Sequence, residues 1–92
     1  MNNEEFYSWA VEQAGQLSAD YAELEYGELS TVNLFQNSTI DSMQLMNLLL
    51  AAEEIFEFSF TEEAFQDRRI QTFQGMLEVI TELKNDRYVG EG

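Results

Sequence analysis

The sequence predicts an all-α protein: a four-helix bundle of three long helices and one short helix, with a long first loop. The chain has 92 residues and no proline, and it is rich in Leu, Glu, Gln, Ala and Met, which favour helix. Its apolar residues recur at three- and four-residue spacing in three separate stretches, which is typical of amphipathic helices. The length suits a single domain over residues 1–92 with one modest core.

The first helix is expected from about Asn3 to about Ala19 or Tyr21. Its apolar stripe contains Phe6, Trp9, Ala10, Ala14, Leu17 and Tyr21. Residues 22–40 mix single apolar residues with Gly, Ser, Thr and Asn. This pattern predicts a long loop attached to the core by its hydrophobic side chains, and such loops are often functional.

The second helix is expected to begin at Asp41-Ser42, two good N-cap residue types, and to continue to about Phe56. Its inward stripe is expected to be Leu45, Leu48, Leu49, Ala52 and Phe56. Residues 57–60 alternate phenylalanine with polar residues, but the chain offers no partner strand. We therefore expect an extended connector there.

A short third helix is expected to begin at Thr61 and to end near Asp67, with acidic residues in its first turn. The last helix is expected from about Thr72. The residues on its apolar side are Phe73, Met76, Leu77, Ile80 and Leu83. Residues 84–92 are expected to form a frayed tail.

The composition disfavours several classes of enzyme and metal site. The chain has no cysteine and no histidine, so it lacks disulfides, thiolate ligands, the commonest general base and the commonest zinc ligand. No loop has the ligand spacing of a calcium-binding loop. We therefore expect no catalytic residue, no metal ligand and no enzymatic turnover from this chain alone.

The charge is strongly negative and unevenly distributed. The net charge is −14, and residues 1–67 hold 14 acidic residues and no Lys or Arg. Such a field repels nucleic acid and anionic membranes and attracts basic protein partners. The acidic N-terminus and the lack of a long apolar run predict no targeting segment and no membrane span. A free-standing, cytoplasmic monomer is the expectation.

The segment 33–43, Asn-Leu-Phe-Gln-Asn-Ser-Thr-Ile-Asp-Ser-Met, resembles the attachment region of the acyl carrier protein family. In that family an Asp-Ser-Leu or Asp-Ser-Met tripeptide opens the second helix. The similarity continues in register through 48–56, 58–63 and Thr72-Phe73, and it covers roughly residues 4–84. A lone Asp-Ser has little value as a signal, whereas the ordered string of matches is far more specific.

The chain also departs from the family pattern at three places. Thr39 or Ser38 stands where a glycine usually precedes the Asp, and Asn47 stands where a glutamate is familiar. Glu57 follows Phe56 where the family commonly has Phe-Gly. These differences bear on the choice of partners more than on the modification.

The resemblance implies that Ser42 carries a covalent 4′-phosphopantetheine arm, transferred from coenzyme A by a magnesium-dependent phosphopantetheinyl transferase. Asp41 either helps to orient that metal or the transferase, or acts only as a helix N-cap. The thiol of the arm supplies the nucleophile that the chain lacks. It would carry acyl or aminoacyl intermediates as thioesters in a specialised polyketide, nonribosomal peptide or fatty-acid-like pathway.

The outward side of the second helix is expected to be a docking face. Its members share a spacing that cannot be buried together with the Leu45 stripe: Met43, Met46, Asn47, Leu50 and Glu54. Exposed methionine and leucine suit transient contact with several partners. The expected partners are the transferase and acyl- or aminoacyl-loading and condensing enzymes with basic docking patches.

A different class of protein explains the charge equally well. A small acidic inhibitor or immunity-type protein, with no prosthetic group, can also be a negative helical bundle that blocks a basic enzyme. That alternative does not explain an Asp-Ser pair at a helix start in register with the further matches.

Overall fold

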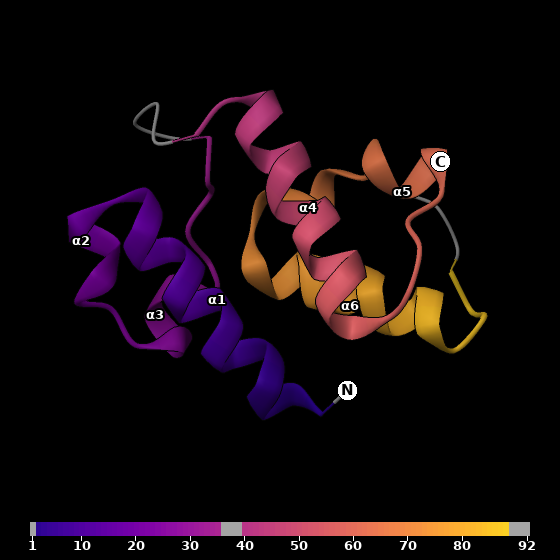
Figure 1. The fold of residues 1–92 in the computed structure, drawn as a ribbon, viewed down its shortest axis with the longest axis horizontal. Coiled ribbons are helices and arrows are strands. Elements are labelled where there is room, and N and C mark those ends of the chain that lie inside the picture. The colour runs from indigo at the N-terminus through magenta and orange to yellow at the C-terminus, as the bar shows by residue number, and fades with distance from the viewer. Residues whose placement is uncertain (1, 36–39, 89–92) are drawn as a thin grey trace.

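The computed structural model describes residues 2–35 and 40–88 (Figure 1). The all-α prediction is confirmed, and the described residues contain no strand. In the described part of the chain three helices are long, and three helices of four residues and one 3₁₀ helix lie between them. In chain order they are α1 (Asn3–Leu17), α2 (Ala19–Ala22), α3 (Tyr26–Leu29), α4 (Ser42–Phe56), α5 (Glu62–Phe65), η2 (Arg68–Gln71) and α6 (Phe73–Lys84).

The first helix is shorter than expected because Ser18 ends it. The Asn2 side chain caps α1 by accepting a hydrogen bond from the Glu5 amide at 2.9 Å. Ser18 has an extended backbone, and its hydroxyl oxygen accepts from the Asp20 amide at 3.2 Å. Ser18 is therefore the N-cap of α2, so the expected continuation to Ala19 or Tyr21 is a separate short helix.

The long connection from residue 22 to residue 40 is attached to the core, as expected, although it also contains α3. Leu29 and Leu34 are fully buried, and Ile40 is buried. The Leu34 amide donates to the Gln71 carbonyl at 2.8 Å, and the Gln74 amide donates to the Ser30 carbonyl at 3.0 Å. Ser38 and Thr39, named above as a departure from the family pattern, lie outside the described residues.

The structure confirms the predicted bounds and inward stripe of α4. Asp41 and Gln44 form a capping box, and the buried residues are Leu45, Leu48, Leu49, Ala52 and Phe56. The helix ends at Glu57, whose φ of 56° is left-handed. Glycine is the usual residue in that conformation, so Glu57 occupies a strained position at the end of the helix.

Aromatic rings join the three long helices in one core. Phe6 of α1 lies 5.9 Å from Phe56 of α4 and 6.4 Å from Phe73 of α6, measured between ring centroids. Trp9 meets the same two rings edge to face at 5.6 and 6.3 Å. α6 also packs closely on η2, because a Cβ at Gly75 would overlap the main chain of Arg69.

The connector and the last two predicted helices also follow the expectation closely. Residues 57–60 form no helix or strand. The Thr61 hydroxyl caps α5 by accepting from the Ala64 amide, and the Thr72 hydroxyl caps α6 by accepting from the Gly75 amide. The short helix ends at Phe65, two residues earlier than expected, because Asp67 begins η2.

Among the described residues, no helix has both the length and the apolar character needed to cross a membrane.

Candidate functional site

Ser42 is the first residue of α4, and its side chain is exposed. No hydrogen bond among the described residues occupies its hydroxyl group. The preceding Asp41 is exposed too, and its carboxylate accepts from the Gln44 amide at 2.8 Å. The Gln44 side-chain oxygen accepts in return from the Asp41 amide at 3.0 Å. Asp41 is therefore the N-cap of α4 in this structure, and its two cap bonds do not involve the Ser42 hydroxyl group.

A pocket of about 250 Å³ lies beside Ser42, which belongs to its lining. Most of the lining is apolar and comes from the first loop, α4, α5 and η2. The other residues that line it are Phe35, Leu45, Met46, Leu49, Phe65, Gln66, Asp67, Ile70 and Gln71. A hydroxyl group at the edge of an apolar pocket can carry a covalent group whose apolar portion is sheltered there.

Gln71 holds the first loop against this pocket. Its carbonyl oxygen accepts from the Leu34 amide, and its side-chain oxygen accepts from the Asn33 amide group at 3.1 Å. The Asn33 side-chain oxygen then accepts from the Phe35 amide at 2.9 Å. Phe35 is thereby fixed as one wall of the pocket.

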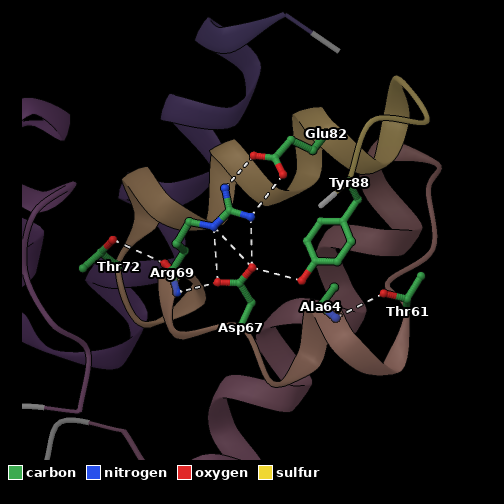
Figure 2. Close-up of polar contacts among 7 residues, drawn as sticks. All are labelled: Thr61, Ala64, Asp67, Arg69, Thr72, Glu82 and Tyr88. Carbon is green, nitrogen blue, oxygen red and sulfur yellow. Dashed lines mark hydrogen bonds and ion pairs between the residues drawn. The ribbon is translucent and has the colours of Figure 1, made fainter. Parts of the chain in front are cut away.

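Asp67, which lines this pocket, also belongs to a partly buried cluster of charged and polar groups (Figure 2). The Asp67 side chain is 0% exposed and pairs with Arg69 at 3.0 Å. The Arg69 guanidinium lies between Asp67 and Glu82, to which it donates two further hydrogen bonds. The Tyr88 hydroxyl donates to Asp67 Oδ2 at 3.0 Å, the same oxygen that the Arg69 Nη2 group contacts. This cluster joins η2, α6 and the segment after α6.

The cluster keeps Asp67 ionised. Burial pushes the pKa of Asp67 up, but the hydrogen bonds from Arg69 and Tyr88 outweigh it and hold the pKa below its ordinary value. Burial and the bond to Asp67 raise the pKa of Tyr88 to about 12. Because both carboxylate oxygens are already hydrogen-bonded, Asp67 is a structural group and not a free general base.

The residues of the expected docking face are all exposed. The exposed fractions are 73% for Met43, 41% for Met46 and 47% for Leu50, and Asn47 and Glu54 are exposed as well. Met46 also lines the pocket beside Ser42. The structure adds Ile55, which is 55% exposed. The three- and four-residue spacing that predicted the docking face does not include Ile55.

Two further hollows were not predicted. One, of about 220 Å³, lies between α1 and α4. It is lined by Gln13, Gln16, Leu17, Gln44, Asn47, Leu48 and Ala51. A more open hollow of about 560 Å³ is lined by residues of α5 and of the C-terminal end, Glu62, Glu63 and Asp86 among them. In the described part of the chain, however, no group of three or more acidic residues could hold a metal ion.

The chain was compared with known proteins in three ways. A scan against protein-family models, a search of curated proteins and a search of solved structures each returned no match. The interpretation of this site therefore depends on its own geometry and on the sequence resemblance at residues 33–43.

Proposed function

We propose that this chain is an acyl carrier protein whose phosphopantetheine arm is attached to Ser42. The observation that carries the proposal is the position of Ser42: it is exposed at the start of α4, directly after the capping Asp41, and beside an apolar pocket.

The chemistry at Ser42 is a phosphoryl transfer. The Ser42 hydroxyl oxygen bonds to the phosphorus that carries the pantetheine arm in coenzyme A, and the diphosphate bond breaks so that adenosine 3′,5′-bisphosphate leaves. The serine proton passes to a base of the transferase, because this chain has no histidine and its nearby Asp41 carboxylate already caps α4. The bound arm supplies a thiol that holds cargo as a thioester.

The arrangement of helices supports the same proposal. We interpret α1, α4 and α6 as the three long helices of the carrier bundle, α5 as its short helix, and α2, α3 and η2 as turns within its connections. The apolar residues of the pocket, Leu45 and Leu49 among them, suit the apolar part of an acyl cargo. We assign the protein to a specialised polyketide, nonribosomal peptide or fatty-acid-like pathway.

The partners follow from the same reasoning. A phosphopantetheinyl transferase loads Ser42, and loading and condensing enzymes then meet the docking face. The net charge of −14 attracts enzymes that carry basic patches. We propose that the protein acts as a cytoplasmic monomer.

The proposal is tested by intact mass. After incubation with coenzyme A, magnesium and a broad-specificity phosphopantetheinyl transferase, the protein should gain one phosphopantetheinyl group. Ser42→Ala should gain none, and Ser38→Ala should be modified like the parent. Modification that persists in Ser42→Ala would refute the assignment. So would a parent protein that stays unmodified under conditions that load a known carrier.

The exposed apolar residues on a strongly acidic protein also fit the alternative, a small acidic inhibitor or immunity-type protein. Such a protein would bind a basic enzyme tightly and would gain no mass in the transferase assay. The same experiment therefore separates the two functions.

A further inference from the structure

The surroundings of Ser42 are almost free of charge, although the protein as a whole is not. Residues 29–52 contain one charged residue, Asp41, and residues 13–19 contain none. Elsewhere the chain carries 17 acidic and 4 basic residues, since Asp41 is one of the 18 acidic residues in total. The charges of this protein are thus separated from the helix that presents its modification site.

The fold brings the two uncharged segments together. Residues from the second half of α1 and from the first three turns of α4 line the hollow of about 220 Å³. Beside it, Met43 and Leu50 project into solvent. We call this surface the neutral face; it consists of Gln13, Gln16, Met43, Gln44, Asn47 and Leu50. The next acids along α4 are Glu53 and Glu54, and Glu53 lies about 16 Å along the helix from Ser42 at 1.5 Å per residue.

The neutral face offers hydrogen bonds but no ion pairs. Its four side-chain amides can donate to or accept from the peptide groups of a partner. A lysine or arginine placed against its centre would lose water beside Met43 and Leu50. The next exposed carboxylates along α1 and α4, Glu12 and Glu54, lie one helical turn beyond Gln16 and Leu50. Asp41 cannot easily supply a carboxylate either, because its side chain already accepts from the Gln44 amide.

We infer that the enzyme surface that covers α4 while Ser42 is being loaded is uncharged opposite the neutral face, with peptide groups that meet its four amides and apolar side chains that meet Met43 and Leu50. The inference rests on the proposed carrier function and specifies the chemistry of its partner. The acidic residues outside the neutral face still attract basic patches and speed the encounter, and within the docking face Glu54 alone carries a charge.

The test places charges of both signs at one position of the neutral face. Asn47→Glu and Asn47→Lys are compared with Asn47→Ala, which removes the amide without adding a charge. The measurement is kcat/KM for loading by a broad-specificity phosphopantetheinyl transferase with coenzyme A. An uncharged partner surface penalises either charge, so both variants should fall at least fivefold below Asn47→Ala.

Asn3 provides a matched control. It is exposed near the start of α1, so Asn3→Glu and Asn3→Lys change the net charge by the same amounts away from Ser42. Both should load within twofold of the parent. Melting curves confirm that each variant is folded. If the Asn47 variants are unstable, Gln16→Glu and Gln16→Lys repeat the test on α1.

The outcomes distinguish the inference from the function beneath it. If Asn47→Glu loads faster than Asn47→Ala while Asn47→Lys loads more slowly, the contacting surface is basic and the inference is wrong. The opposite order would show an acidic surface, and two variants that load like Asn47→Ala would show that the face is not covered. A parent protein that is never loaded refutes the carrier function itself.

Discussion

Arg69→Met should destabilise the protein strongly, because it leaves a buried carboxylate without its cation. The Asp67 side chain is 0% exposed, whereas the side chains of Arg69 and Glu82 are 21% and 29% exposed. Methionine retains part of the apolar length of the arginine, so the substitution mainly removes the guanidinium group. Asp67 would then keep two donors, the Tyr88 hydroxyl group and the main-chain amide of residue 69.

The magnitude follows from the burial of the pair. Removing one partner of a fully buried ion pair costs about 3–5 kcal/mol. Here Arg69 is partly exposed and Asp67 keeps two hydrogen bonds, so we expect a loss of about 2–3 kcal/mol of unfolding free energy at pH 7.

The loss should depend on pH with a definite sign. In the folded protein, the net effect of burial, which raises the pKa of Asp67, and of the Arg69 and Tyr88 hydrogen bonds, which lower it, is a pKa below the ordinary 3.8. The stability that Asp67 contributes is therefore present above about pH 4 and is lost as the pH falls through the lowered folded pKa. Arg69→Met removes the side-chain hydrogen bonds and the charge of Arg69, which lower the pKa, so the pKa of Asp67 rises in the variant. The difference between parent and variant should be largest near pH 7 and should shrink below pH 4.

Urea unfolding followed by Trp9 fluorescence measures this difference, since Trp9 is the single tryptophan and is 6% exposed. Arg68→Met is the matched control, because Arg68 is the exposed neighbour in the same 3₁₀ helix. The reasoning is refuted if Arg69→Met costs no more than Arg68→Met, or if its cost is the same at pH 3 and pH 7.

Three other predictions test the two faces of α4, the C-terminal end of α4, and the ionisation of Tyr26 and Tyr88. Leu49→Glu should unfold the protein, since Leu49 is 1% exposed, whereas Leu50→Glu should change the unfolding free energy by no more than about 0.5 kcal/mol but should slow loading. If circular dichroism melts show the reverse, the buried and exposed faces of α4 are assigned the wrong way round. Glu57→Gly should raise the unfolding free energy by about 1 kcal/mol, because it relieves a left-handed residue; a loss in urea titration would contradict this. Burial raises the pKa values of Tyr26 and Tyr88 from 10.0 to about 12. The stability that these two protonated phenols contribute should therefore be fully present below pH 10 and should be lost as the pH rises toward 12. If the phenolate absorbance of all four tyrosines titrates near pH 10, this prediction is wrong.

The sequence predicted the features that depend on local spacing. The start of α4 was visible in Asp41-Ser42, because N-cap residues and the helix they begin are neighbours in the chain. Its buried stripe follows from the period of 3.6 residues alone. The exposure of Met43 and Leu50 follows in turn, because one helix face cannot be buried together with its opposite.

The features that the sequence did not reveal depend on residues distant in the chain. Arg69 pairs with Glu82, 13 positions away, and Tyr88 reaches Asp67 across 21 positions. No local pattern indicates which of the 18 acidic residues Arg69 will meet. The pocket beside Ser42 escaped prediction for the same reason, since its walls come from four separate segments. Only Ser18 gave a local signal that could have been used, because serine is a common N-cap and it marks the break between α1 and α2.

The few basic residues of the chain contribute to the stability of the fold, and the proposed docking face contains none of them. All four basic residues lie beyond position 67. Arg69 holds the Asp67 cluster together, and the Lys84 side chain donates to the Phe56 carbonyl at the end of α4, 2.6 Å away. The acids of residues 1–67 therefore remain largely uncompensated; under the proposed function they attract partners at long range, and the neutral face is the surface of contact. It follows that Arg69→Met should lower stability without changing kcat/KM for loading of the folded protein. Asn47→Glu should lower kcat/KM for loading without changing stability. A variant at either position that changed both stability and kcat/KM would show that the same residues determine folding and docking.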